Sequence, residues 1–200
     1  MQVEPIFPQA VLYINKVNIN SIEILKYLTK IKFIKTNNTE AGHASCYISE
    51  DEKIFEELSL LKIEVYLQIK NYLKNVMKFK MDFQFTSSWA TKTDVNGFSQ
   101  THNHLNSFIS GVYYPKGDKN FNIKFYKEQY FWNIGKTEVN YFNAQDLTIN
   151  IAEDSTLILF PSSLRHSIEK NLSKETRYSI AFNTLPFGEI GTGDSKVNFK

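Results

Sequence analysis

Two stretches, MDFQFT at residues 81–86 and FNIKFY at residues 121–126, alternate apolar and polar side chains from one residue to the next. Successive side chains of a β-strand point to opposite faces, so this alternation is typical of strands with one buried face. Further apolar runs bounded by turn-forming residues lie at 107–114, 147–151, 156–160 and 177–183. Many short strands at this spacing predict a mainly β sandwich or barrel with helices packed outside it.

The residues before these strands follow the period of a helix. Apolar side chains recur at intervals of three and four residues from Ile54 to Val76, which predicts an amphipathic helix. A shorter helix is predicted over residues 21–33, with Ser21 or Asn20 as its cap. The 200 residues therefore predict one domain. We expect a helical part at 1–80, a β core at 81–188 and a loosely held tail at 189–200.

The composition excludes several classes of protein. A net charge of +2 is too small for the basic footprint of a protein whose main partner is nucleic acid. The sequence contains no run of about 18 apolar residues that could span a membrane. Its N-terminus has no basic region followed by an uninterrupted apolar stretch, so we expect no secretory signal. The single cysteine, Cys46, cannot form an internal disulfide, which favours the reducing cytoplasm.

Three of the four histidines lie at predicted strand ends. His102 and His104 are two residues apart, so on a strand both imidazoles would project from the same face. His166 follows the apolar run 157–160, where a strand would turn at the rim of a barrel. The pattern allows a three-histidine metal site, whereas the alternative is that these imidazoles cap turns or lie on the surface. A site of this kind could also hold Zn²⁺ and activate water for hydrolysis.

Arg177 follows His166 by a stretch long enough for a strand end, a turn and a returning strand. Its guanidinium could therefore point into the same cavity from a neighbouring strand. Arg177 and Ser179 would face the same way and could bind one carboxylate together. Taken alone, Arg177 would more often be a solvated hairpin cation, and its position relative to His166 is what favours the site.

The order of these residues resembles that of the iron(II)- and 2-oxoglutarate-dependent oxygenases, and in particular a 2OG-Fe(II) oxygenase family of bacteria and their viruses. The segments that carry the resemblance are Ser88-Trp89, His102-Asn103-His104, SGVYY at 110–114, FPS at 160–162 with His166, and RYSIAFN at 177–183. The resemblance runs from Ile6 to about Gly188.

The resemblance implies a double-stranded β-helix, which is a jelly roll, with Fe(II) at one mouth. It implies His102, His104 and His166 as iron ligands and Arg177 as the residue that binds the C5 carboxylate of 2-oxoglutarate, with Ser179 or a neighbouring tyrosine, Tyr113, adding a hydrogen bond. The implied reaction consumes O2 and 2-oxoglutarate, releases succinate and CO2, and hydroxylates an unidentified substrate. Residues 91–101 and 127–145 are the loops expected at the mouth.

One departure from the family pattern concerns the metal ligands. The usual third ligand is a carboxylate two residues after the first histidine, where this sequence has His104. The site could use three histidines, or water could complete it with His104 outside the ligand set, or Asn106 could occupy the carboxylate position after His104. We favour the three histidines, and we read Asp94 and Asp118 as turn residues.

Two other readings stay open. A cupin would also place His-x-His on one strand, but it usually has a Glu a few residues later, and residues 105–109 contain none. A metal-free jelly-roll binding module is the second alternative, and it would leave the three histidines and Arg177 together by coincidence.

Overall fold

The computed structural model describes residues 12–35, 46–127 and 144–199. The predicted mouth loop at 127–145 therefore lies almost wholly outside the described residues. The elements in chain order are β1 (Tyr13–Lys16), α1 (Ser21–Leu28), β2 (Phe33–Lys35), β3 (Cys46–Ser49), the short 3-10 helix Ile54–Glu56, α2 (Ser59–Asn71), the π-helical turn Tyr72–Val76, β4 (Asp82–Thr93), β5 (Ser99–His102), β6 (Ile109–Tyr114), β7 (Asn122–Tyr126), β8 (Asp146–Asn150), β9 (Thr156–Pro161), β10 (His166–Ile168), β11 (Arg177–Ile190), the 3-10 turn Gly193–Ser195 and β12 (Val197–Phe199).

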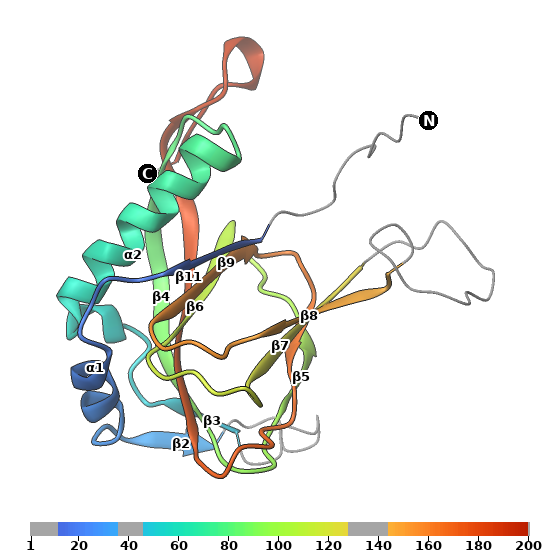
Figure 1. Ribbon diagram of the computed structural model, residues 1–200. Coiled ribbons are helices and arrows are strands. Elements are labelled where there is room, and N and C mark those ends of the chain that lie inside the picture. The colour runs from blue at the N-terminus through green and yellow to red at the C-terminus, as the bar shows by residue number, and fades with distance from the viewer. Residues whose placement is uncertain (1–11, 36–45, 128–143, 200) are drawn as a thin grey trace.

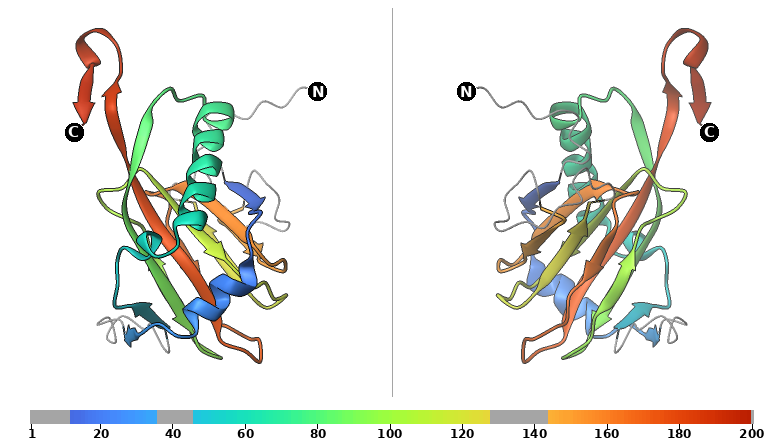
Figure 2. Two further views of the ribbon diagram at one scale, coloured as in Figure 1. Left: turned by 90° about the vertical axis from the view of Figure 1, so that its left-hand side faces the viewer. Right: turned by 90° about the vertical axis from the view of Figure 1, so that its right-hand side faces the viewer.

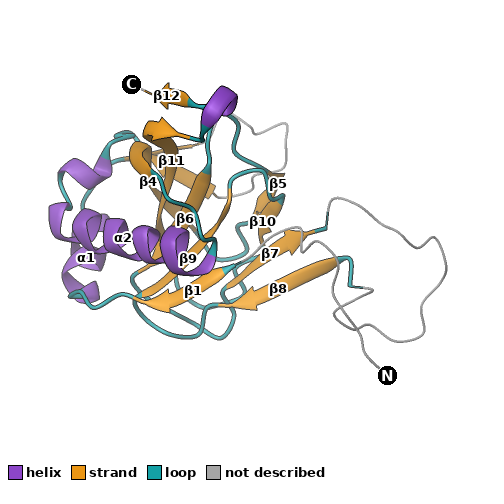
Figure 3. Cartoon of the chain, turned by 90° about the horizontal axis from the view of Figure 1, so that it is seen from above, coloured by secondary structure: helices purple, strands orange, loops and turns teal. Residues whose placement is uncertain are grey.

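Two antiparallel sheets face each other (Figure 1). The described part of the larger sheet has eight strands in the order β1-β9-β6-β11-β4-β3-β2, with β12 paired to β11. The smaller sheet has four strands in the order β5-β10-β7-β8. This arrangement is the expected jelly roll. In the view from above, the helices lie on one side of the larger sheet and the smaller sheet lies on the other (Figure 3).

The outer face of the larger sheet is sealed by the helices. Leu61, Val65 and Ile69 of α2 pack with Leu28 of α1 onto apolar strand residues such as Phe182. This is the larger of two buried apolar clusters. Because β6 and β9 are buried on both faces, their sequences contain nearly continuous apolar or small residues.

The space between the sheets holds the second apolar cluster, which includes Val112, Ile158 and Phe160 from the larger sheet and Ile123 and Phe125 from the smaller. On β11, side chains that face this interior alternate with side chains that face the helices. The interior face therefore carries Arg177, Ser179, Ala181 and Asn183 in succession.

The structure differs from the sequence predictions at the two ends of the chain. The predicted 21–33 helix ends at Leu28, and its apolar face includes Ile24 whereas Ile22 is exposed. The N-terminal part is also more than helical, since β1, β2 and β3 join the larger sheet. The predicted loose tail instead continues β11 to Ile190 and returns as β12, forming a hairpin that projects beyond the body (Figure 2). Among the described residues, no helix is long and apolar enough to cross a membrane.

Candidate metal centre and anion site

His102 and His166 face each other across neighbouring strands of the smaller sheet. Their Cα atoms are partners in the β5–β10 register, and their ring centroids lie 4.4 Å apart. His166 is buried against the edge of Phe160, at a centroid distance of 4.7 Å. Strand pairing therefore brings together two imidazoles that are 64 residues apart in the sequence.

His104 reaches the same point from outside the strand. β5 ends at His102, and the backbone N–H of His104 donates to the carbonyl of Ser162 at 3.0 Å. The His104 ring lies 5.1 Å from the His166 ring and 5.8 Å from the Trp89 ring, measured between centroids. Each of the three histidines offers one ring nitrogen, and these nitrogens all lie within 4.8 Å of one another.

The hydrogen bonds of two imidazoles leave their Nε2 atoms free to bind a cation. Nδ1 of His102 lies 2.8 Å from the Gln100 carbonyl, and Nδ1 of His166 lies 3.0 Å from the Leu164 carbonyl. A carbonyl can only accept, so each Nδ1 carries the proton and each neutral ring keeps a lone pair on Nε2. Metal-bound histidines are held in this way by an acceptor behind the ring.

Burial and mutual repulsion keep His104 and His166 neutral. Desolvation, with a smaller contribution from His102, lowers the pKa of His104 to about 4. Desolvation likewise lowers the pKa of His166 to about 3, aided by His102 and His104 and opposed by the bond to Leu164. Neutral nitrogen ligands without competing protons fit iron(II) or another divalent transition metal.

Arg177 lies at the opposite end of the interior, where β11 begins. Its side chain is 2% exposed, and its guanidinium lies 5.3 Å above the centre of the Phe121 ring. Within the described residues, its Nη1 and Nη2 atoms have no hydrogen-bond partner. Desolvation lowers the Arg177 pKa, although arginine remains charged at such depths. A buried cation without an anion is costly, so this end of the interior fits an anionic ligand.

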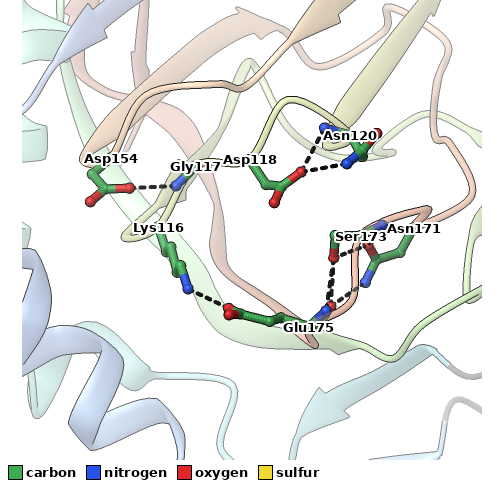
Figure 4. Close-up of polar contacts among 8 residues, drawn as sticks. All are labelled: Lys116, Gly117, Asp118, Asn120, Asp154, Asn171, Ser173 and Glu175. Carbon is green, nitrogen blue, oxygen red and sulfur yellow. Dashed lines mark hydrogen bonds and ion pairs between the residues drawn. The ribbon is translucent and has the colours of Figure 1, made fainter.

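Three acidic side chains in the surrounding loops have partners other than Arg177 (Figure 4). Glu175 pairs with Lys116, and Asp154 accepts from the backbone N–H of Gly117 at 2.8 Å. Asp118 accepts from the backbone and side chain of Asn120. These contacts tie together the loops that close this end, and none of them neutralises Arg177.

The tyrosine beside Arg177 is Tyr114. Its hydroxyl is fully buried and has no partner among the described residues. Burial raises the pKa of Tyr114 to about 12, and the charge of Arg177 opposes the rise. The resemblance implied Tyr113 for this role, but it is Tyr114 that packs in the interior between the sheets. Tyr113 faces the helices, and its hydroxyl bonds Ser155 at 3.0 Å. The strand alternation separated the two tyrosines, but sequence alone did not show which face was interior.

Ser179 lies on the interior face with Arg177, as expected from their spacing. Its Oγ is 2.5 Å from Oγ1 of Thr91 on β4. Cys46 is a buried strand residue whose Sγ lies 3.8 Å from Oγ1 of Thr93, and burial raises the pKa of its thiol.

The residues considered as alternative ligands lie in turns. Asp94 accepts from the Thr176 hydroxyl at 3.1 Å, and Asn106 is an exposed turn residue with a φ of 51°. Residues 94–97 are part of the loop expected at the mouth. They form hydrogen bonds with Asn171, near the end of the interior where Arg177 lies. None of these residues joins the histidine cluster.

Comparison with known proteins agrees with this geometry. Residues 87–183 match the profile of the family described as "Putative 2OG-Fe(II) oxygenase". This segment contains the three histidines, Tyr114, Arg177 and Ser179. Over these 97 of its 200 residues, the chain is similar to this family of 2-oxoglutarate- and iron(II)-dependent oxygenases. No curated protein sequence matches it.

Solved structures share the fold at low sequence identity. HygX from Streptomyces hygroscopicus, with nickel, 2-oxoglutarate and hygromycin B bound, superposes with a TM-score of 0.61 at 8% identity, covering 88% of this chain and 82% of that one. A prolyl hydroxylase from Trichoplax adhaerens, in complex with a hypoxia inducible factor peptide, gives 0.61 at 15% identity, covering 87% and 83%. An oxidoreductase of the 2OG-Fe(II) oxygenase family from Burkholderia pseudomallei gives 0.58 at 8% identity, covering 82% and 76%.

Proposed function

We propose that this oxygenase holds iron(II) with His102, His104 and His166, binds the C5 carboxylate of 2-oxoglutarate with Arg177, and hydroxylates a carbon atom of its substrate. The observation that carries the proposal is the pair of unpartnered polar groups at the closed end. Arg177 and the Tyr114 hydroxyl are buried and have no hydrogen-bond partner in the described part of the chain, and one carboxylate would satisfy both.

The iron would supply the chemistry, because iron(II) with bound 2-oxoglutarate activates O2 while the cosubstrate becomes succinate and CO2. The role of the protein side chains is to orient the cosubstrate. The two N–H groups of the Arg177 guanidinium would fix the orientation of the cosubstrate, and the Tyr114 hydroxyl would donate a hydrogen bond to the same carboxylate. Ser179 would add a hydrogen bond from the neighbouring rung of β11.

The apolar side chains between the two ends would keep water out of this space. Val112, Phe125, Ile158 and Phe160 are buried there, and they separate the histidines from Arg177 with apolar surface. Such a lining strengthens the ion pair at Arg177 because the local dielectric is low. We place the enzyme in the cytoplasm, where a lone buried thiol and iron(II) both remain reduced.

The test is an anaerobic titration of metal-free protein with Fe(II) and then with 2-oxoglutarate. We expect a visible charge-transfer band when the cosubstrate binds the iron, and slow release of succinate once O2 is admitted. Iron binding without this band would favour a cupin-like enzyme, and no metal binding at all would favour a metal-free module. Ester hydrolysis by the zinc-loaded protein without succinate formation would favour a hydrolase.

Variants assign the ligands in the same titration. His166→Ala should abolish iron binding, because it removes one ligand of three. His104→Asp should retain binding if position 104 is a ligand, since it restores the usual carboxylate. Asn103→Ala is the matched control, because this exposed residue lies between two proposed ligands and should leave the titration unchanged. Full iron affinity in His166→Ala would contradict the ligand set.

A further inference from the structure

Three polar side chains are buried beside the histidines and have no part in the proposed function. Ser110 of β6 is 1% exposed, Ser162 after β9 is 1% exposed, and Asn183 of β11 is 9% exposed. All three lie in segments that the sequence analysis singled out for their resemblance to the family, yet none was given a role. Buried polar groups cost free energy unless they are fully hydrogen-bonded, so their arrangement needs an explanation.

These side chains form one directed chain of hydrogen bonds. The Ser110 hydroxyl donates to Oδ1 of Asn183 at 2.7 Å. A hydroxyl has one proton, so the 2.8 Å contact between Ser110 and Ser162 must have Ser162 as donor. Nδ2 of Asn183 then donates to the Ser87 hydroxyl at 3.4 Å. The direction of each bond depends on the next, so removing one member leaves its neighbours unsatisfied.

This series of hydrogen bonds ends at Ser162, whose carbonyl binds the backbone of His104. The Ser162 carbonyl accepts the His104 N–H at 3.0 Å, and the Ser162 N–H donates to the Phe108 carbonyl at 3.0 Å. The Phe108 N–H in turn donates to the carbonyl of Thr184, the residue after Asn183, at 2.7 Å. Backbone hydrogen bonds therefore join both ends of the 104–108 segment to the hydrogen-bonded serines and asparagine or to residues next to them in the sequence.

His104 needs such support more than the other two histidines do. His102 and His166 are each oriented by a bond from Nδ1 to a carbonyl. For His104, the described residues provide its ring with packing against Trp89 and the other imidazoles and with no hydrogen bond. The direction of its ring thus depends on where its backbone is held.

We propose that Ser110, Ser162 and Asn183 act as a single positioning unit that fixes the backbone of His104 and so sets the geometry of the metal site. The inference rests on the proposed function, because it assumes that His104 binds the metal. The unit takes the place of the acceptor that orients each of the other two imidazoles.

Cobalt(II) is the probe, because its visible absorption reports both binding and coordination geometry without turnover. We expect Ser110→Ala and Ser162→Ala each to raise the Co(II) dissociation constant about tenfold and to shift the visible bands. Because the residues act as one unit, the double variant should bind Co(II) no more than about threefold more weakly than either single variant.

Ser88→Ala is the matched control. Ser88 is a buried serine on the helix-covered face of β4, and its hydroxyl accepts the Phe55 N–H at 3.0 Å. This substitution should lower the melting temperature as much as Ser110→Ala does and leave the Co(II) spectrum unchanged.

Each outcome decides one claim. Equal Co(II) spectra and affinities in wild type, Ser110→Ala and Ser162→Ala would show that the chain only stabilises the fold, and would overturn the proposal. A double variant weakened by the product of the two single effects would overturn the idea of one unit. A wild-type protein that binds no Co(II) would overturn the proposed metal site itself, and the positioning role with it.

Discussion

The two faces of the larger sheet are built from the same strands and do different things. The face toward the helices buries Leu157, Leu159, Ile180 and Phe182 in an apolar cluster. The face toward the smaller sheet carries Arg177 and Ser179, together with Tyr114 and Asn183. On β11 the two sets alternate residue by residue, so a shift of one position would exchange them.

The two faces differ in role: the helix-covered face stabilises the fold, and the interior face carries the side chains available to bind ligands. The helix-covered face satisfies its packing within the protein, whereas on the interior face a cation and a hydroxyl have no hydrogen-bond partner among residues 12–35, 46–127 and 144–199. Substitutions on the first face should change the free energy of unfolding, and substitutions on the second should change ligand binding.

Phe182→Ala should have the largest effect on stability. The Phe182 ring packs on Phe55 and Phe85, at centroid distances of 5.3 and 5.7 Å, and it also fills the space over Gly111, where even a Cβ atom would collide with it. Truncating a buried phenylalanine costs about 3–5 kcal/mol of unfolding free energy. Urea unfolding measures the loss, and a change below about 1 kcal/mol would contradict the tight packing of this face.

Arg177→Met tests the interior face, where we expect a loss of ligand affinity and no loss of stability. Without its guanidinium, 2-oxoglutarate should bind more weakly by about 2–5 kcal/mol, which is roughly one and a half to three and a half orders of magnitude in dissociation constant. The metal-free protein should be as stable as wild type or more so, because a buried charge without a partner is removed. Calorimetry in the presence of an inert divalent metal measures the affinity, and unchanged affinity would end the assignment of Arg177 to the cosubstrate.

Lowering the pH should destabilise the metal-free protein through the interior face. The folded pKa values of His104 and His166, about 4 and about 3, lie below the ordinary value of 6.5, so below that pH the unfolded chain binds more protons. Stability contributed by each histidine is fully present above pH 6.5 and falls by about 1.4 kcal/mol per pH unit as the pH drops toward the folded pKa.

Urea unfolding at pH 7.5 and at pH 5 measures this loss. Replacing both residues, as His104→Gln with His166→Gln, should flatten the profile by the amount they contribute. An equally steep profile in the double variant would show that other groups, and not these imidazoles, take up the protons.

Periodicity was enough to predict a mainly β sandwich or barrel with helices outside it, because alternation at 81–86 and 121–126 and helical spacing at 54–76 report burial directly. The jelly roll itself was predicted from the family resemblance. The helix at 54–76 nevertheless proved to be three consecutive segments, since the backbone is irregular at both ends of α2. The hairpin in the tail was not predicted, because its strands depend on pairing between β11 and β12, which composition does not encode.

The site was predictable as a set of residues and only partly as a geometry. His102, His166 and Arg177 follow from order along the chain, whereas the route of His104 through the Ser162 carbonyl depends on a loop contact between distant segments. The choice between Tyr113 and Tyr114 required knowing which face of β6 is covered by helices. That fact belongs to tertiary packing and cannot be read from alternation.

The same two tyrosines give the smallest but cleanest test of the comparison, because they are adjacent, equally buried and chemically identical. Tyr113→Phe removes a hydroxyl that bonds Ser155 at 3.0 Å, so it should cost about 1 kcal/mol of unfolding free energy and leave 2-oxoglutarate affinity unchanged. Tyr114→Phe removes a hydroxyl with no described partner, so stability should stay level or rise while cosubstrate affinity falls by about 1 kcal/mol, or roughly fivefold. Urea unfolding and calorimetry on both variants complete the test. If Tyr113→Phe were the variant that lost cosubstrate affinity, the assignment of the two faces would have to be reversed, and the sequence-based choice of Tyr113 would be restored.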